Sequence, residues 1–305
     1  MPSPPPLSGL RVVDLTMGVA GAYAAKLFAD AGADVVWVEP PGGDPLRRWS
    51  ASGRSLDTQG DGVLLRYLRT SQRSSVLDLA SSSGRAALLR LYASADLVFE
   101  SFAPGRLAEL GLGWDALREL RPQASLVSIT PFGQTGPWRA WPANEFTLQA
   151  WSGCLACRGR GGFGPVQAGG QLGEPMGGVC AAVAALAAQR RADRSGAGSW
   201  VDLSLLEVMV PAFTNLATVW GSLSGLWDLP PSDEIPSVHP TRDGHIGFCI
   251  FTGQQWQDFT VLIEQPQLRD QPDLSTMPGR IQRGDEIRGL IDDFTRRFTT
   301  DEIAE

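Results

Sequence analysis

The stretch Leu10–Glu39, LRVVDLTMGVAGAYAAKLFADAGADVVWVE, decides the fold of this chain. Its first part, Leu10–Leu15, is a short apolar run typical of a buried strand, and Val19–Ala31 carries apolar residues at helical spacing. A second run rich in valine, Ala33–Glu39, follows and again predicts a strand. Strand, helix and strand in this order indicate a β-α-β unit with two parallel strands.

The alternation of strands and helices continues toward residue 200. Further strands are predicted at Ser75–Leu79, Asp96–Glu100, Ala124–Ile129 and Trp200–Leu203, and helices at Gly84–Ser94, at Pro104–Leu120, from Glu145 onward and at Pro175–Ala192. Because each crossover helix has to bury its apolar face on the sheet, the pattern predicts an α/β fold, with a Rossmann-like parallel sheet domain over residues 1–200. Ligands of such sheets bind at the carboxyl ends of the strands.

A second, smaller α/β domain is predicted for residues 230–305. Residues 201–229 are expected to form a connecting helix and a linker, and the proline-rich segment 230–236, PPSDEIP, is typical of a break between domains. The small domain begins with an Asp243-Gly244 turn before the apolar run Ile246–Phe251. Helices are predicted there at Gly253–Glu264 and Gly284–Phe298.

The composition excludes several classes of protein. With 305 residues, 43% of them hydrophobic and 19% charged, the chain is neither a small disulfide scaffold nor a disordered protein. A formal net charge of −7 argues against a nucleic-acid partner, because that binding needs clustered cations. The longest apolar stretch, Val179–Ala188, is shorter than the about 20 residues of a membrane span, and the N-terminus carries no targeting signal. We therefore expect a cytoplasmic protein without a membrane partner.

Two familiar cofactor motifs are incomplete. Gly18 and Gly21 lie in the first turn after the first strand, but they form only G-x-x-G, whereas a dinucleotide fingerprint needs three glycines. Cys154 and Cys157 form a C-x-x-C without the second ligand pair that a zinc site requires. The sequence therefore predicts neither a nicotinamide cofactor nor a metal.

Glu174 is the residue most suggestive of chemistry. It stands in LGEPMGG, residues 172–178, between a glycine-rich loop and a predicted helix. Pro175 suits the first helical position, which places Glu174 near the N-cap, where the helix dipole favours an ionised carboxylate. Such a carboxylate can attack an activated carbonyl, and the glycines around it would let a bulky substrate approach. A glutamate that only caps the helix is the alternative.

Five stretches carry a resemblance to a known family. They are residues 6–16 (PLSGLRVVDLT), 31–45 (AGADVVWVEPPGGDP), 95–105 (ADLVFESFAPG), 131–137 (PFGQTGP) and 196–205 (GAGSWVDLSL). Together with Asp243-Gly244 and Gln255-Trp256 they resemble the family III CoA-transferases, which include formyl-CoA transferase, carnitine CoA-transferase and α-methylacyl-CoA racemase. The resemblance extends over essentially the whole chain.

The resemblance implies transfer of CoA from an acyl-CoA thioester to a small carboxylic acid. In that family a carboxylate, usually of aspartate, carries the acyl group and then CoA, and Glu174 stands at the matching position. The extra methylene of glutamate moves the carboxylate by about 1 Å unless the backbone compensates, which can cost ~100-fold in rate. A catalytically silent CoA-thioester-binding or partner subunit is therefore the alternative function.

The family pattern also suggests residues around CoA. Its phosphates would need cations, and the arginines in matching loops are Arg47, Arg48, Arg73 and Arg106. Val19, Ala20, Leu77 and Phe102 match positions that line the CoA site or its acyl end. Ala80 and Glu109 stand where relatives can carry basic residues, and Trp49, Trp138 and Trp151 are candidates for the acyl pocket. Each of these residues has an ordinary structural role as the alternative.

Two further expectations follow from the resemblance. Asn144 stands where the racemase branch has a histidine that moves a proton, so a 2-methylacyl-CoA racemase is a less favoured alternative. Family members form interlaced homodimers in which the chain returns from the small domain to the large one. We expect this chain to be truncated before that return, because it ends at Glu305, and to act as a homodimer or as a partner subunit.

Overall fold

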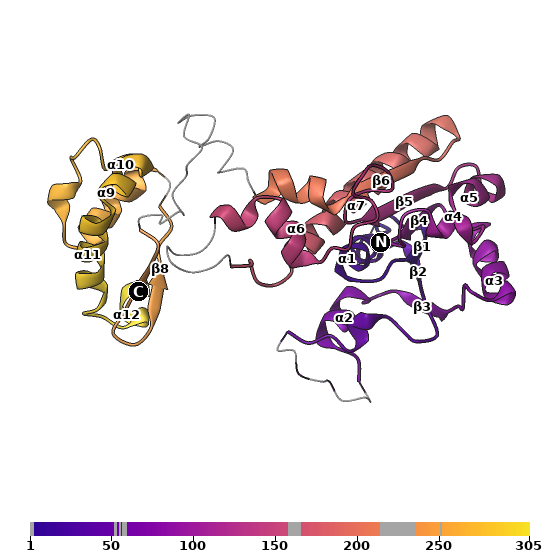
Figure 1. Ribbon diagram of the computed structural model, residues 1–305, viewed down its shortest axis with the longest axis horizontal. Coiled ribbons are helices and arrows are strands. Elements are labelled where there is room, and N and C mark those ends of the chain that lie inside the picture. Colours follow the sequence, from indigo (N-terminus) through magenta and orange to yellow (C-terminus); the bar gives the residue numbers. More distant parts are fainter. Residues whose placement is uncertain are drawn as a thin grey trace. The chain divides into compact units, whose positions relative to one another are not determined.

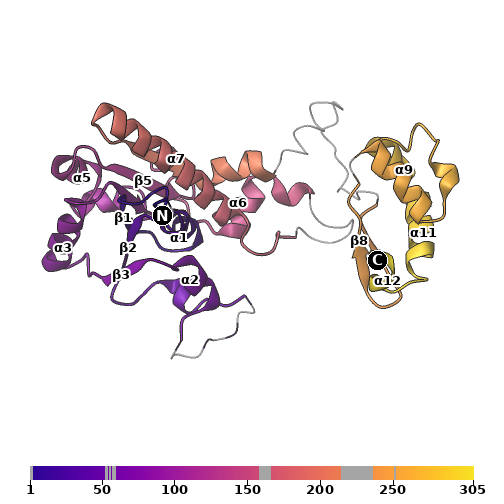
Figure 2. The same cartoon turned by 180° about the vertical axis from the view of Figure 1, so that it is seen from behind.

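A computed structural model describes residues 3–305 except 52, 53, 55, 57–59, 158–165, 214–235 and 251. The described residues fall into two compact units, one up to residue 213 and one from residue 236 (Figures 1 and 2). The predicted linker and most of the predicted connecting helix lie outside the described residues. The predicted domain boundaries therefore stay a prediction.

The first unit is built on a six-stranded, entirely parallel sheet. Its strands are β1 (Arg11–Leu15), β2 (Asp34–Glu39), β3 (Arg73–Val76), β4 (Leu97–Glu100), β5 (Ser125–Thr130) and β6 (Trp200–Ser204). Their order in the sheet is β3-β2-β1-β4-β5-β6, so the direction of winding reverses between β1 and β4. The predicted α/β fold is confirmed, and the carboxyl edge between β1 and β4 is the place where such sheets bind ligands.

Helices cover both faces of this sheet (Figures 1 and 2). They are α1 (Val19–Asp30), α2 (Val63–Leu68), α3 (Ser82–Tyr92), α4 (Arg106–Glu109), α5 (Trp114–Leu120), α6 (Glu145–Trp151) and α7 (Gly173–Ser195), with 3-10 turns at Pro45–Arg47 and Cys154–Cys157. Residues 205–213 are also helical. One core joins α1 and α7 to the sheet through Phe28, Phe99 and Ile129, and a second lies on the other face around Leu88, Val98 and Leu117. The predicted helix 104–120 is two helices, and α2 was not predicted.

Two glycines near the start of α7, Gly177 and Gly178, face neighbouring parts of the protein at close range. A Cβ on Gly178 would lie 2.5 Å from the carbonyl oxygen of Ala20, and one on Gly177 would lie 2.2 Å from Cδ2 of Leu205. The expectation that glycines near Glu174 leave room for a substrate is therefore wrong for Gly177 and Gly178. Gly177 leaves room for Leu205, and Gly178 leaves room for the backbone of Ala20, so the start of α7 lies against the start of α1.

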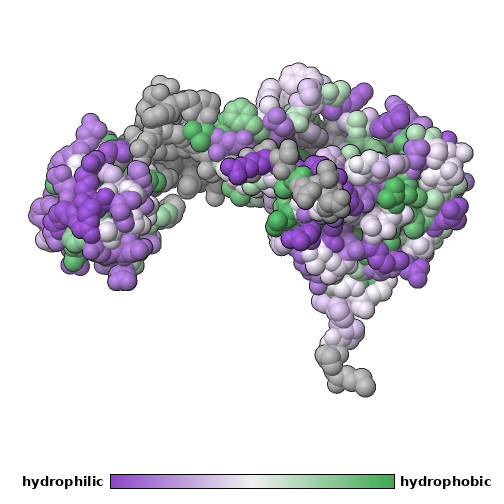
Figure 3. Space-filling view, turned by 90° about the horizontal axis from the view of Figure 1, so that it is seen from below, coloured by the Kyte–Doolittle hydropathy of each residue, from purple (hydrophilic) through white to green (hydrophobic). Residues whose placement is uncertain are grey.

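The second unit is small and mostly helical. An antiparallel pair, β7 (Val238–Pro240) and β8 (His245–Gly247), precedes α9 (Gly253–Leu262), a 3-10 turn at Pro266–Leu268, α10 (Met277–Gln282), α11 (Gly284–Thr295) and α12 (Thr300–Ala304). Its core is formed by Trp256, Phe259, Ile287 and Ile291. The predicted Asp243-Gly244 turn lies between β7 and β8, and only the first two residues of the apolar run that begins at Ile246 belong to β8. The elements β7, α10 and α12 were not predicted. On the face shown in Figure 3, hydrophilic residues cover most of this unit.

No described helix, not even the 23-residue α7, combines the length and the apolar composition that crossing a bilayer requires.

Candidate active site

Two loops meet at the point where the strand order reverses. Leu15 at the end of β1 is paired with Glu100 at the end of β4. In the loops that follow, the amide of Met17 donates to Oγ of Ser101 at 3.0 Å, and this hydroxyl donates to the Met17 carbonyl at 3.3 Å. The two loops are thus joined at the edge of the sheet where a ligand is expected.

The carboxylate of Glu174 lies at the start of α1. Its Oε2 accepts a hydrogen bond of 2.8 Å from the amide of Val19, the first residue of that helix. Helix α1 has no capping side chain of its own, because Gly18 precedes it with a φ of 89°. The prediction that Glu174 lies near the start of α7 is correct, but the helix that its side chain caps is α1, 155 residues earlier in the chain.

The start of α7 is capped by another carboxylate, that of Glu145. Oε1 of Glu145 accepts from the amide of Gly173 at 2.8 Å, and Oε2 accepts from the amide of Glu174 at 3.1 Å. Glu145 is the first residue of α6 and is buried. Each of two helices is therefore capped by a carboxylate from another helix: Glu145 of α6 caps α7, and Glu174 of α7 caps α1.

Burial raises the pKa of Glu174 above its ordinary value. The amide of Val19 acts in the opposite direction, the charge of Glu145 adds to the increase, and the amide of Ala20 opposes it. The sequence suggests that a helix terminus keeps this carboxylate ionised. Helix amides do contact it, but their effect on the pKa is smaller than that of desolvation. A poorly hydrated carboxylate of raised pKa is a stronger nucleophile than one in water.

Four predicted CoA-lining residues lie along the carboxyl edge of the sheet. Val19 and Ala20 form the first turn of α1 and are buried. Leu77 follows β3, and Phe102 follows β4; both are half-buried and pack against the same core. The structure thus brings these residues to the edge at which Glu174 is held.

Arg47 and Arg73, which were predicted to bind the phosphates of CoA, are paired with carboxylates of the protein. Arg47 is paired with Glu39 at 2.6 Å and Asp61 at 2.6 Å, and these partners raise the pKa of its guanidinium. Arg73 pairs with Asp34 at 2.7 Å; both residues begin their strands, so this pair lies at the amino edge. The structure does not bring Arg73 to the edge that holds Glu174.

The remaining two arginines are exposed at the carboxyl side. Arg48 follows the 3-10 turn that comes after β2. Arg106 is the first residue of α4 and forms an exposed ion pair of 3.0 Å with Glu109. Glu109 therefore offsets part of the positive charge that Arg106 would offer to a phosphate.

Three tryptophans form a partly exposed cluster. Trp138 lies 4.9 Å from Trp151 and 5.8 Å from Trp141, measured between ring centroids. Trp141 was missed by the sequence analysis. Trp49 is not part of this cluster and packs on a separate core around Trp37. Trp49 therefore does not lie with Trp138 and Trp151, although the three were predicted as candidates for the same acyl pocket.

The sequence analysis also missed a buried charge cluster at the end of β1. Arg69 pairs with Asp14 on β1 and, at 3.3 Å, with Asp44, and its guanidinium lies 4.3 Å from the ring of Trp37. Asp14 also accepts from the amide of Thr16 at 2.8 Å, and so holds the loop that leads to α1. The one signal in the sequence is a charged residue, Asp14, inside an apolar strand.

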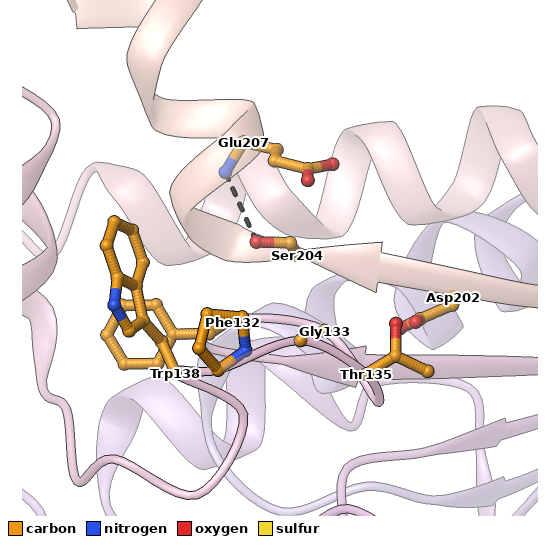
Figure 4. A pocket seen from close by; sticks show the side chains of 9 residues that line it. Phe132, Gly133, Thr135, Trp138, Asp202, Ser204 and Glu207 are labelled. Carbon is orange, nitrogen blue, oxygen red and sulfur yellow. Dashed lines mark hydrogen bonds between the residues drawn. The ribbon is translucent and has the colours of Figure 1, made fainter.

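A cavity of about 350 Å³ lies beside the end of β6 (Figure 4). Figure 4 shows Asp202 and Glu207 beside it, with Phe132 and Trp138 on another side. Glu174 does not line this cavity. Two carboxylates make it a poor place for the phosphates of CoA.

Comparison with known proteins decides the family. The family model described as CoA-transferase family III matches residues 7–305. This chain belongs to CoA-transferase family III. The predicted resemblance is thereby confirmed.

Several family members are similar along most of the chain. The succinyl-CoA–D-citramalate CoA-transferase of Chloroflexus aurantiacus is 32% identical over 311 residues, which cover 98% of this chain and 75% of that protein. One subunit of the succinyl-CoA:(R)-benzylsuccinate CoA-transferase of Thauera aromatica is 36% identical, covering 87% and 65%. The crystal structure of a CAIB/BAIF family protein from Brucella suis has a TM-score of 0.83 at 26% identity, covering 99% and 81%.

Proposed function

We propose that this family III CoA-transferase moves CoA from an acyl-CoA thioester to a carboxylic acid through a covalent intermediate on Glu174. The observation that carries the proposal is the desolvated carboxylate of Glu174, held by the amide of Val19 at the reversal point of the sheet. Because the loops that follow β1 and β4 meet at this point, a thioester bound along the carboxyl edge would bring its carbonyl to the Glu174 carboxylate.

The proposed reaction balances without a redox partner. The Glu174 carboxylate attacks the thioester carbonyl, the C–S bond breaks, and CoA thiolate and a mixed anhydride result. The thiolate attacks the Glu174 carbonyl of the anhydride, so the donor acid leaves and a glutamyl-CoA thioester remains. The acceptor carboxylate attacks this thioester, and the released thiolate then attacks the acceptor carbonyl, which forms the new acyl-CoA and frees Glu174.

The CoA thioester is proposed to lie over Val19, Ala20, Leu77 and Phe102. Arg48 and Arg106 are the predicted cations best placed for its phosphates, whereas Arg47 is already held by two carboxylates. Relatives named for succinyl-CoA make this thioester the first donor to test. A homodimer or a partner subunit is proposed as the working assembly, and one similar protein is named as a subunit.

The second candidate is a CoA-binding partner subunit without turnover. The observation in its favour is that Glu109 and Asp61 offset cations that the phosphates would need. A racemase receives no such support, because the side chain of Asn144 caps α6 by accepting from the amide of Thr147 at 2.9 Å.

Covalent trapping separates the two candidates. The protein is incubated with succinyl-CoA, treated with hydroxylamine or borohydride, digested and analysed by peptide mass spectrometry. A transferase gives an adduct on the peptide that contains Glu174 and none in Glu174→Gln. CoA binding without any adduct in the unaltered protein would leave the silent subunit as the function.

A further inference from the structure

We propose that Glu145 and Gln149 are positioning residues for Glu174. Together they fix the loop before α7 and the first turn of that helix, and so keep the carboxylate on the amide of Val19. The two residues are four positions apart on α6 and therefore share one face of it. The inference rests on the proposed function, because it concerns the reach of the same carboxylate.

The first contact is between Glu145 and the two amides that begin α7. The residue before this helix, Leu172, offers no capping side chain, so the amides of Gly173 and Glu174 would lack partners. Glu145 supplies one carboxylate oxygen to each of them. Because the second amide belongs to Glu174 itself, its backbone is held directly from α6.

The second contact extends the clamp to the preceding loop. Gln149 is fully buried, and its Nε2 donates to Oε1 of Glu145 at 2.7 Å and to the carbonyl of Ala168 at 3.2 Å. Its Oε1 accepts from the amide of Ala168 at 2.9 Å. The loop six residues before Glu174 and the helix that carries Glu174 are thus bound to the same pair of side chains.

Gly173 makes the close approach of Glu145 possible. A Cβ at this position would lie 2.1 Å from Cε of Met209 and 3.0 Å from Oε1 of Glu145. The first turn of α7 is therefore enclosed between α6 and the helical residues 205–213. The turn has little room to shift while Glu145 is in place.

The negative charge of Glu145 gives the proposal a readout, the pKa of Glu174, that an uncharged helix cap would not change. Among the described groups, Glu145 is the charged side chain that acts on Glu174, beside the uncharged amides of Val19 and Ala20 on α1. Its negative charge opposes ionisation of Glu174. Removing the charge therefore lowers the pKa of Glu174, whereas loss of a purely structural cap would not do so.

Three variants test the proposal. Glu145→Gln keeps the shape but loses the charge and one acceptor oxygen, Glu145→Asp keeps the charge but shortens the reach, and Gln149→Leu cuts the link to Ala168. All three should lower kcat for transfer by about tenfold to 100-fold, the size expected for a displacement of about 1 Å, with KM for succinyl-CoA changed less than kcat. Only Glu145→Gln should also move the acidic limb of the pH profile to lower pH. Glu119→Gln, the same change at an exposed site on α5, is the control.

Hydrogen exchange gives a readout that does not depend on turnover. Amides of residues 166–178 should exchange faster in Glu145→Gln and Gln149→Leu than in the unaltered protein, while the peptides of β1 and β4 stay unchanged. Unchanged exchange in both variants would overturn the inference even if the enzyme proves inactive. An active enzyme in which all three variants keep kcat and the pH profile would overturn it too, whereas an unaltered protein without adduct contradicts the proposed function instead.

Discussion

Substituting Gly178 by alanine is the sharpest test of how the site is held. The new Cβ would lie 2.5 Å from the carbonyl oxygen of Ala20, which is backbone and cannot rotate away. Restoring an ordinary contact requires α1 and α7 to separate by about 1 Å. Glu174 is carried by α7 and its partner Val19 by α1, so the separation acts directly on their hydrogen bond of 2.8 Å.

The expected losses follow from this displacement. Misplacing the carboxylate by about 1 Å should reduce kcat by ~100-fold. Overpacking should lower the free energy of unfolding by about 1–3 kcal/mol, offset in part by the better helix propensity of alanine. Initial rates of succinyl-CoA consumption and urea unfolding measure the two quantities.

Gly177→Ala is the matched control, since it makes the same chemical change one position earlier. Its Cβ would meet Cδ2 of Leu205, the end of a side chain that can change rotamer, so its losses should be smaller. Equal rates and equal stabilities for the unaltered protein and Gly178→Ala would refute the reasoning.

Three other predictions concern charges in and around the site. Glu174→Gln should abolish transfer. Because burial raises the pKa of Glu174 in the folded protein, its ionised carboxylate lowers the stability of the fold. The variant should therefore be more stable than the unaltered protein at pH values above the unfolded pKa near 4.5, and equally stable below it, as urea unfolding at several pH values measures. Arg69→Met leaves the buried carboxylate of Asp14 unpaired and should lower the free energy of unfolding by about 3–5 kcal/mol in the same assay. Arg106→Gln should raise KM for the CoA thioester by roughly fivefold with kcat unchanged, whereas Arg73→Gln at the opposite edge should leave both values unchanged in steady-state kinetics.

Local pattern was sufficient for the fold class and for singling out Glu174. Apolar runs with the period of strands and helices specify which segments bury which faces, and their alternation leaves few arrangements other than a parallel sheet. A carboxylate between glycines and a helix start is likewise visible in consecutive residues.

Local sequence pattern could not predict which distant segments of the chain contact one another. The sequence suggested that Arg73 lies in a loop that matches a CoA-binding position, yet Arg73 is the first residue of β3, and its register with Val36 puts it at the amino edge. The cluster of Asp14, Asp44 and Arg69 joins three separate segments, so no window of sequence contains it.

The chain's own residues thus determined that a parallel α/β sheet forms and that one glutamate lies in the first turn of α7. The tertiary structure alone decided which helix that glutamate caps, that burial raises its pKa and which side chains position it. The physical reason is that desolvation, charge and hydrogen bonding depend on neighbours in space. For Glu174 these neighbours are Val19 and Glu145, which lie far from it along the chain.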